Sequence, residues 1–304
     1  MAENLESGWI LLVISAFNLV ATNGVLTTSH WMAAFEAQSK ATGIFILDLL
    51  IYFFQDILST EAGRTIFETI FSFAMVSVTL VLYEGSRKRD KYSQIALALF
   101  GMISQFVGIA FATPLYLYFI SNAGSYSSHV GTFRSIVNIL FGFITFCFTV
   151  IIVYKQDVSK APVEMTCFLL VPVVGNFINV VLDMGKSKPK MASNTIHFLL
   201  YYLAVPVGVF TYYRLLRVLY FNAEGFANAV LSNGAYSFLA IDAVGLIAAC
   251  YLWYLMVADI ATLFKTLPLL FLLGPTAHFA ILCIVREMSL NAETELMEEK
   301  VKSA

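Results

Sequence analysis

Residues Ile136–Tyr154 read IVNILFGFITFCFTVIIVY, nineteen residues without a charged side chain. A stretch of about 20 largely apolar residues is long enough for an α-helix to cross the hydrocarbon core of a bilayer. The same character extends over all 304 residues, of which 59% are hydrophobic and 12% are charged. A soluble domain carries about 25% charged residues. We therefore predict an all-α fold, a polytopic transmembrane helical bundle, which excludes a cytosolic enzyme, a secreted disulfide scaffold and a disordered chain.

Nine apolar segments are candidate membrane spans. We expect about eight of them to cross the membrane fully, because the second is short and acidic. Residues 1–286 then form one transmembrane domain, and residues 287–304 form a short charged cytosolic tail. The candidate spans are Trp9–Thr28, Gly43–Leu58, Ile66–Tyr83, Gln94–Ile120, Ile136–Tyr154, Met165–Leu182, Thr195–Tyr220, Tyr236–Phe264 and Leu267–Val285.

Lys and Arg collect on the cytosolic side of membrane proteins. If nine segments cross and the basic cluster at 87–91 is cytosolic, twelve basic residues lie inside and six lie outside. The main exception is the basic segment 186–190, which falls outside. This distribution favours a cytosolic C-terminus, and the endoplasmic reticulum is the membrane expected for a polytopic eukaryotic chain of this composition.

Charge and cysteine usage exclude further classes. The net charge of −2 offers no basic field for nucleic acid. The four cysteines lie in apolar runs without C-x-x-C spacing, which indicates buried thiols rather than a metal site or disulfides. We therefore expect no metal and no cofactor.

Three acidic residues stand inside apolar segments, where a charge costs about 2.5–3.5 kcal/mol on insertion scales. These are Asp48, Glu68 and Asp242, and they are our candidate catalytic residues. Cations within the spans are few, so we expect desolvation to keep these acids neutral and able to donate a proton. Glu68 could instead pair with Arg64, four residues earlier on the same helix. Asp56 and Asp259 are expected near the membrane surfaces, where water solvates them.

Aromatic residues are the second signal, with 27 Phe and 15 Tyr. Many would form interfacial belts, and the others could line a cavity whose ring faces stabilise a cation. Polar groups at membrane depth are the candidate substrate contacts, although amides there also serve as contacts between helices. These candidates are Tyr52, one turn after Asp48, and Gln105, Tyr116, Asn138 and His197.

Short motifs in the chain resemble small fungal integral membrane proteins that include transmembrane cyclases of meroterpenoid biosynthesis. They are Asp48 within GIFILDLL at 43–50, Pro114-Leu115-Tyr116, and the stretch from Gly274-Pro275 to Arg286-Glu287. The resemblance implies that membrane-embedded acids protonate a terminal epoxide on a prenyl chain and that ring closure quenches the cation. The chain is longer than the better-known cyclases, and only Asp48 and the region of Glu68 match in kind.

Together, the buried acids and the aromatic content predict a metal-independent terpene cyclase. Its substrate would be a hydrophobic prenylated aromatic compound with an epoxidised chain, taken from the lipid bilayer. The alternative is a proton-coupled carrier or exporter of a small hydrophobic molecule that uses Asp48 and Asp242. A third reading is a sterol or lipid binder without catalytic activity.

Overall fold

The computed structural model describes residues 3–28, 31–37, 42–87, 91–122, 132–155, 160–183, 198–258 and 260–303. Within these ranges the chain is helical and has no strand, which confirms the all-α prediction. The helices are α1 (Glu3–Thr28), α2 (Trp31–Glu36), α3 (Phe45–Leu58), α4 (Glu61–Arg87), α5 (Lys91–Phe106), α6 (Ile109–Asn122), α7 (Thr132–Tyr154), α8 (Pro162–Asp183), α9 (Leu199–Ser232), α10 (Gly234–Val257) and α11 (Ile260–Ser303).

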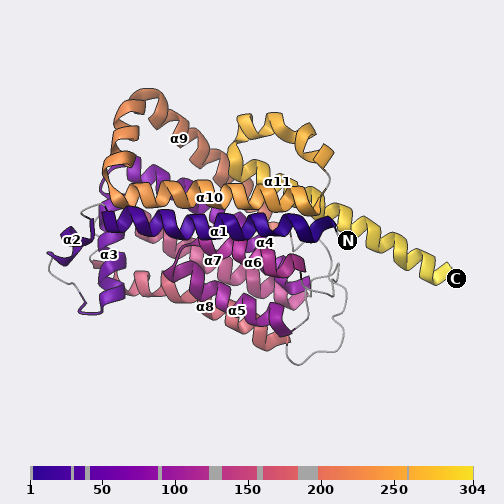
Figure 1. Cartoon of the computed structure of the whole chain (residues 1–304). Coiled ribbons are helices and arrows are strands. Elements are labelled where there is room, and N and C mark those ends of the chain that lie inside the picture. The colour runs from indigo at the N-terminus through magenta and orange to yellow at the C-terminus, as the bar shows by residue number, and fades with distance from the viewer. Residues whose placement is uncertain are drawn as a thin grey trace.

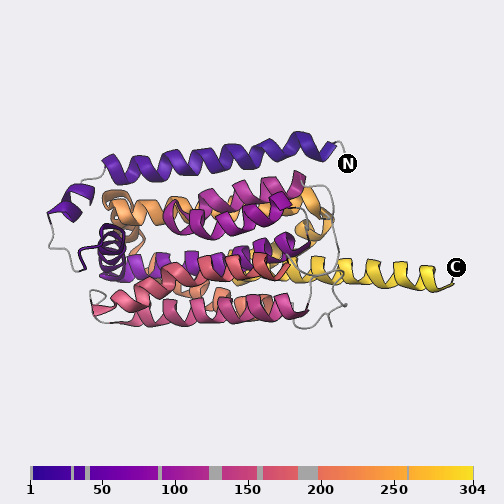
Figure 2. The same ribbon diagram turned by 90° about the horizontal axis from the view of Figure 1, so that it is seen from below.

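Six of the described helices are long and apolar enough to cross a membrane, namely α1, α4, α7, α9, α10 and α11. Shorter apolar helices lie within α5, α6 and α8. Most of the long helices run along one common axis, and both chain termini lie at the same end of the bundle (Figures 1 and 2). This arrangement is that of an integral membrane protein. Of the about eight full spans expected, six described helices are long enough to cross the membrane by themselves.

Helix α3 lies across the end of the bundle that is remote from the termini. It is seen nearly end-on in Figure 2, where the other long helices run across the view. Its segment was predicted to fall short of a full span, and the structure agrees. Trp31 of α2 packs on this helix, with ring centroids 5.0 Å from Tyr52 and 5.9 Å from Phe53.

The prediction that Gln94–Ile120 forms one continuous span is wrong. Helix α5 ends at Phe106, Gly108 has a φ of 116°, and α6 begins at Ile109. The two helices pack against each other as a hairpin that turns inside the bundle (Figure 2). Only glycine adopts such a φ without strain, and the apolar composition of the segment conceals the reversal.

The last predicted span, Leu267–Val285, is also interrupted. Gly274 has a φ of 82° and a ψ of 168°, and the two parts of α11 run in different directions on either side of it (Figure 1). Thr266 and His278 face each other across this turn, with Oγ1 and Nε2 2.9 Å apart. Irregular backbone at membrane depth is tolerated only where protein buries it or where it lines a cavity.

The α5–α6 hairpin changes the expected distribution of basic residues. Because this hairpin returns to the end at which it began, the helices after it run opposite to the predicted directions. The ring of Tyr201, early in α9, lies 5.8 Å from that of Tyr83, late in α4. The start of α9 thus belongs to the end of the bundle that contains Arg87. The basic segment 186–190, the main exception in the predicted charge distribution, lies outside the described residues.

Candidate functional site

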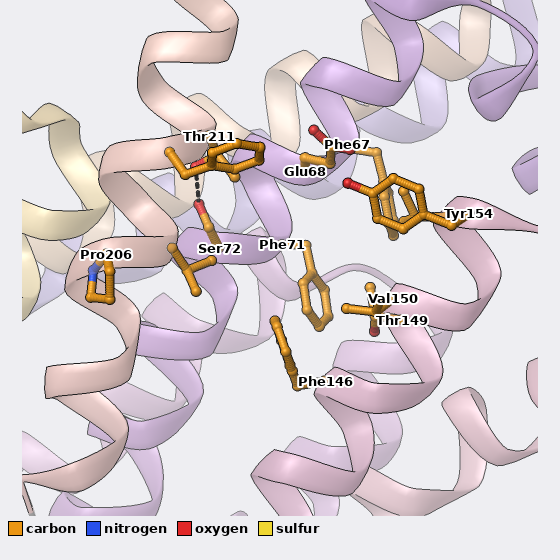
Figure 3. Close-up of a pocket in the computed structure, with 13 residues that line it drawn as sticks. Phe67, Glu68, Phe71, Ser72, Phe146, Thr149, Val150, Tyr154, Pro206 and Thr211 are labelled. Carbon is orange, nitrogen blue, oxygen red and sulfur yellow. Dashed lines mark hydrogen bonds between the residues drawn. The ribbon is translucent and has the colours of Figure 1, made fainter.

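A cavity of about 330 Å³ opens between α4, α7 and α9 (Figure 3). This volume lies at the lower end of the range for small-molecule sites, about 300–1,000 Å³. Its walls are mainly apolar and aromatic, with a few polar groups. The apolar lining consists of Phe67, Phe71, Phe146, Val150, Val153, Pro206, Val207 and Phe210, and the polar lining of Glu68, Ser72, Thr149, Tyr154 and Thr211.

The charged group of this cavity is Glu68, which pairs with Arg214 of α9. Arg214 Nη1 donates to both carboxylate oxygens, at 2.6 and 2.7 Å. The Glu68 side chain is 9% exposed and that of Arg214 is 24% exposed. The alternative pairing with Arg64 is wrong, because Arg64 donates to the carbonyl of Leu58 at 3.1 Å. The expectation of an acid without a cation is therefore wrong for Glu68, since a helix remote in sequence supplies its partner.

Three hydroxyl groups join the helices beside the cavity. Ser72 Oγ lies 3.0 Å from Thr211 Oγ1 and 3.0 Å from Thr276 Oγ1, which connects α4, α9 and α11. Gly208 permits this contact, because a Cβ at its position would lie 2.7 Å from Thr276 Cβ. The interhelical hydroxyls thus hold the pocket-forming faces of α4 and α9 in register.

Asp48 lies away from the cavity, at the start of α3. Its carboxylate accepts hydrogen bonds from Thr42 N and Oγ1, both at 2.7 Å, and from Gly43 N at 3.0 Å. A carboxylate in the first turn of a helix is also favoured by the helix dipole. The geometry gives Asp48 a structural role in the turn that precedes α3. Tyr52 lies one turn further, where burial and the nearby charge of Asp56 raise the pKa of its hydroxyl.

Asp242 lies in a third place, in the interior of α10. Its Oδ1 accepts a hydrogen bond from the backbone N of Ala110 at 3.0 Å. Ala110 lies in the first turn of α6, directly after the hairpin turn at Gly108. The three predicted catalytic acids therefore do not form one site, and Glu68 is the one that lines the cavity.

The predicted substrate contacts also fall elsewhere. None of the predicted contact residues that the structure describes lines the cavity, because these residues lie on other helices or on other faces of the same helices. Tyr116 and Asn138 are buried within the bundle, Gln105 is partly buried near the end of α5, and His197 lies outside the described residues. Asp56, expected to be solvated, accepts hydrogen bonds from Trp31 Nε1 at 2.9 Å and from Asn233 Nδ2 at 3.1 Å. Asp259 lies outside the described residues.

The sequence contained a signal for the cavity that was not used. Its lining residues recur at intervals of three and four on each helix, for example Phe67 and Phe71 on α4, and Val207 and Thr211 on α9. Such spacing defines one face of a helix. It does not say which three helices place these faces together, and so Arg214 and the wall formed by Phe146 were missed.

A second group of charges was also missed, at the end of the bundle that holds the termini. Arg87 of α4 bonds to Glu84 and to Glu287 of α11, and Arg286 Nη1 donates to Glu84 at 2.7 Å. The Arg286 guanidinium also lies 4.9 Å from the ring centre of Trp253. Two acids and two bases balance, so this neutral quartet connects α4 to α11 without leaving a net charge.

The chain has no match among known protein families, curated proteins or solved structures. The α4–α7–α9 cavity combines aromatic ring faces, several hydroxyl groups and the carboxylate of Glu68, whose charge Arg214 balances. Such a lining suits a hydrophobic molecule with one uncharged polar group, because an anion or a cation would disturb the neutral pair.

Proposed function

We propose that the α4–α7–α9 cavity binds a small hydrophobic molecule from the bilayer and that the protein cyclises it. The proposed substrate is an epoxidised prenylated aromatic compound, and the proposed membrane is that of the endoplasmic reticulum. One observation carries the proposal: Glu68, one of the three predicted acids, lies in a cavity lined by aromatic rings. Ring faces stabilise developing positive charge through their quadrupole.

The proposed reaction is an isomerisation in which the protein donates one proton and receives one proton back. A proton adds to the epoxide oxygen, the C–O bond breaks, an alkene of the prenyl chain attacks the resulting carbocation, and a proton is lost from the new ring. The Tyr154 hydroxyl points toward Glu68 (Figure 3) and is the proposed proton donor. The Glu68 carboxylate, held by Arg214, is the proposed acceptor of the released proton. Transfer from Glu68 back to the Tyr154 oxygen completes the cycle.

The test uses microsomes that contain this chain and an epoxyfarnesyl aromatic compound, with EDTA present. Chromatography and mass spectrometry would detect an isomer of unchanged mass. Glu68→Gln should abolish product formation. The matched control is Glu164→Gln, since Glu164 forms its ion pair with Lys155 and does not line the cavity. Unchanged turnover in folded Glu68→Gln, or no isomer from any epoxide tested with folded wild type, would refute the proposal.

A carrier of a small hydrophobic molecule is the second candidate. It is favoured by the two turns inside the bundle, at Gly108 and Gly274. Interrupted helices form the substrate sites of many transporters. Sealed vesicles distinguish the two functions. A carrier moves its substrate in response to a proton gradient and releases it unchanged, whereas a cyclase converts it in detergent without any gradient.

A further inference from the structure

The tip of the α5–α6 hairpin is held by hydrogen bonds from two other helices. From α1, Ser15 Oγ donates to the carbonyl of Phe111 at 2.9 Å, and Asn18 Nδ2 donates to the carbonyl of Ala110 at 2.8 Å. From α10, Asp242 accepts from Ala110 N at 3.0 Å. The hairpin is thereby docked through the first turn of α6, and α1 and α10 form the receiving surface.

The geometry of this surface is tight. A Cβ on Gly108 would lie 3.1 Å from Asp242 Oδ1, and a Cβ on Gly245 would lie 2.2 Å from Asn18 Oδ1. The glycine at the turn therefore lets the backbone approach the carboxylate. The glycine on α10 lets α1 approach closely enough for Asn18 to reach the tip.

Of the groups that hold the tip, Asp242 is the one that can change its charge. Its side chain is buried, with 5% of the residue exposed. Among the described residues no cation forms an ion pair with it, in contrast to Glu68 and Glu84. A buried carboxylate at membrane depth without a cation is rare and expensive, and such residues commonly bind and release protons.

We propose that Asp242 is a proton-binding site that controls the docking of the α5–α6 hairpin. The ionised carboxylate accepts a charge-assisted hydrogen bond from Ala110 N and faces the positive end of the α6 dipole. The protonated carboxyl group accepts only a weaker hydrogen bond between neutral groups from Ala110 N, and it loses its attraction to the dipole of α6. Protonation thus weakens the docking of the tip, and ionisation strengthens it. This inference holds for either proposed function, since it rests on contacts outside the cavity.

Several ionisable groups on the helices around α10 are held by partners of their own. Helix α1 contributes the uncharged Ser15 and Asn18 to the tip, and α6 contributes backbone groups. On α3, Asp48 bonds to Thr42 and Gly43, and Asp56 to Trp31 and Asn233. On α4, Glu68 pairs with Arg214 of α9, Glu84 pairs with Arg87 and Arg286, and Arg64 donates to the carbonyl of Leu58. On α11, Glu287 pairs with Arg87, and His278 bonds to Tyr251 and Thr266. His278 also titrates near neutral pH, so the test must separate it from Asp242.

The test measures how readily the tip opens as pH changes. Val107→Cys is placed at the turn in the full-length chain after its four native cysteines are replaced by alanine. Reaction with a membrane-permeant maleimide is timed across a pH series. Ser121→Cys, near the far end of α6, reports the ordinary effect of pH on thiol reactivity in the same hairpin. The ratio of the two rates then isolates the opening of the tip.

We expect this ratio to rise about fivefold from alkaline to acidic pH, because a charge-assisted hydrogen bond contributes more than a neutral one. In Asp242→Asn, which keeps an acceptor but cannot ionise, the ratio should stay at the high value at all pH. Ser15→Ala removes an uncharged contact and should raise the ratio equally at every pH. His278→Gln should leave the pH dependence unchanged.

Two results would overturn the proposal. One is a ratio of the two maleimide reaction rates that does not change with pH while Asp242 is present. This result can be interpreted even if Asp242→Asn does not fold. The other is a pH dependence that persists in Asp242→Asn or disappears in His278→Gln, which would assign the effect to another group.

Discussion

Separating the Glu68–Arg214 ion pair should destabilise the protein unequally, depending on which partner is removed. Arg214→Gln leaves the Glu68 carboxylate in the bundle without its cation. Glu68→Gln leaves an amide oxygen that still accepts from Arg214, and the guanidinium, being more exposed, can reach water or headgroups. We therefore expect Arg214→Gln to be the more damaging change and Glu68→Gln to be mild.

The magnitude follows from the burial of the two side chains. Breaking a fully buried pair costs about 3–5 kcal/mol, whereas exposed pairs contribute about 0.2–1 kcal/mol. With side-chain exposures of 9% and 24%, this pair lies between the limits. We expect a loss of about 2–3 kcal/mol for Arg214→Gln and a coupling energy of about 2 kcal/mol in a double-mutant cycle.

The assay is reversible unfolding in mixed micelles with increasing sodium dodecyl sulfate, followed by circular dichroism. Wild type, both single variants and the double variant form the cycle. The Lys155–Glu164 pair, which is more exposed, supplies a parallel cycle whose coupling should stay below about 1 kcal/mol. Equal coupling in the two cycles, or a greater loss from Glu68→Gln than from Arg214→Gln, would refute the reasoning.

Three further predictions concern other parts of the bundle. Gly274→Val should prevent correct folding, because a Cβ there would lie 2.4 Å from Tyr212 Cγ and the φ of 82° is unfavourable for valine. Size-exclusion chromatography should then show loss of the monodisperse peak. Asp48→Ala should cost about 1 kcal/mol in the same unfolding assay without affecting ligand binding, since its carboxylate bonds to the turn before α3; loss of binding with full stability would contradict this. Arg87→Met should lower the free energy of unfolding by about 3–5 kcal/mol, because it leaves the buried Glu287 carboxylate without its arginine partner. A second change, Glu287→Gln, makes the cluster neutral again and should recover part of this loss.

The class of fold could be predicted from composition because the bilayer permits few structures. A chain that is 59% hydrophobic must satisfy its backbone hydrogen bonds within helices when it enters lipid. The segment Ile136–Tyr154 accordingly corresponds to α7, which ends at Tyr154. The prediction was wrong for Gln94–Ile120, where two helices turn at Gly108 inside the bundle. Hydropathy measures the affinity of a segment for lipid and does not reveal whether its path is straight.

The candidate site illustrates the same limit for side chains. Burial of Asp48 and Asp242 was predicted correctly from their apolar surroundings. Their roles were not, because a carboxylate that holds a turn and one that faces a cavity look alike in sequence. Asp48 bonds to Thr42, six residues away, whereas Asp242 bonds to Ala110, 132 residues away, and Glu68 pairs with Arg214, 146 residues away.

The sequence by itself therefore determined that this protein resides in lipid, that it is helical, and where ionisable residues stand within its apolar segments. These properties follow from local composition, since each residue contributes its transfer free energy wherever the chain goes. Only the tertiary structure decided that α4, α7 and α9 line one cavity, that Arg214 neutralises Glu68 there, and that Asp242 contacts the tip of a hairpin. Such contacts depend on which helix faces meet, and packing between helices remote in sequence selects those faces.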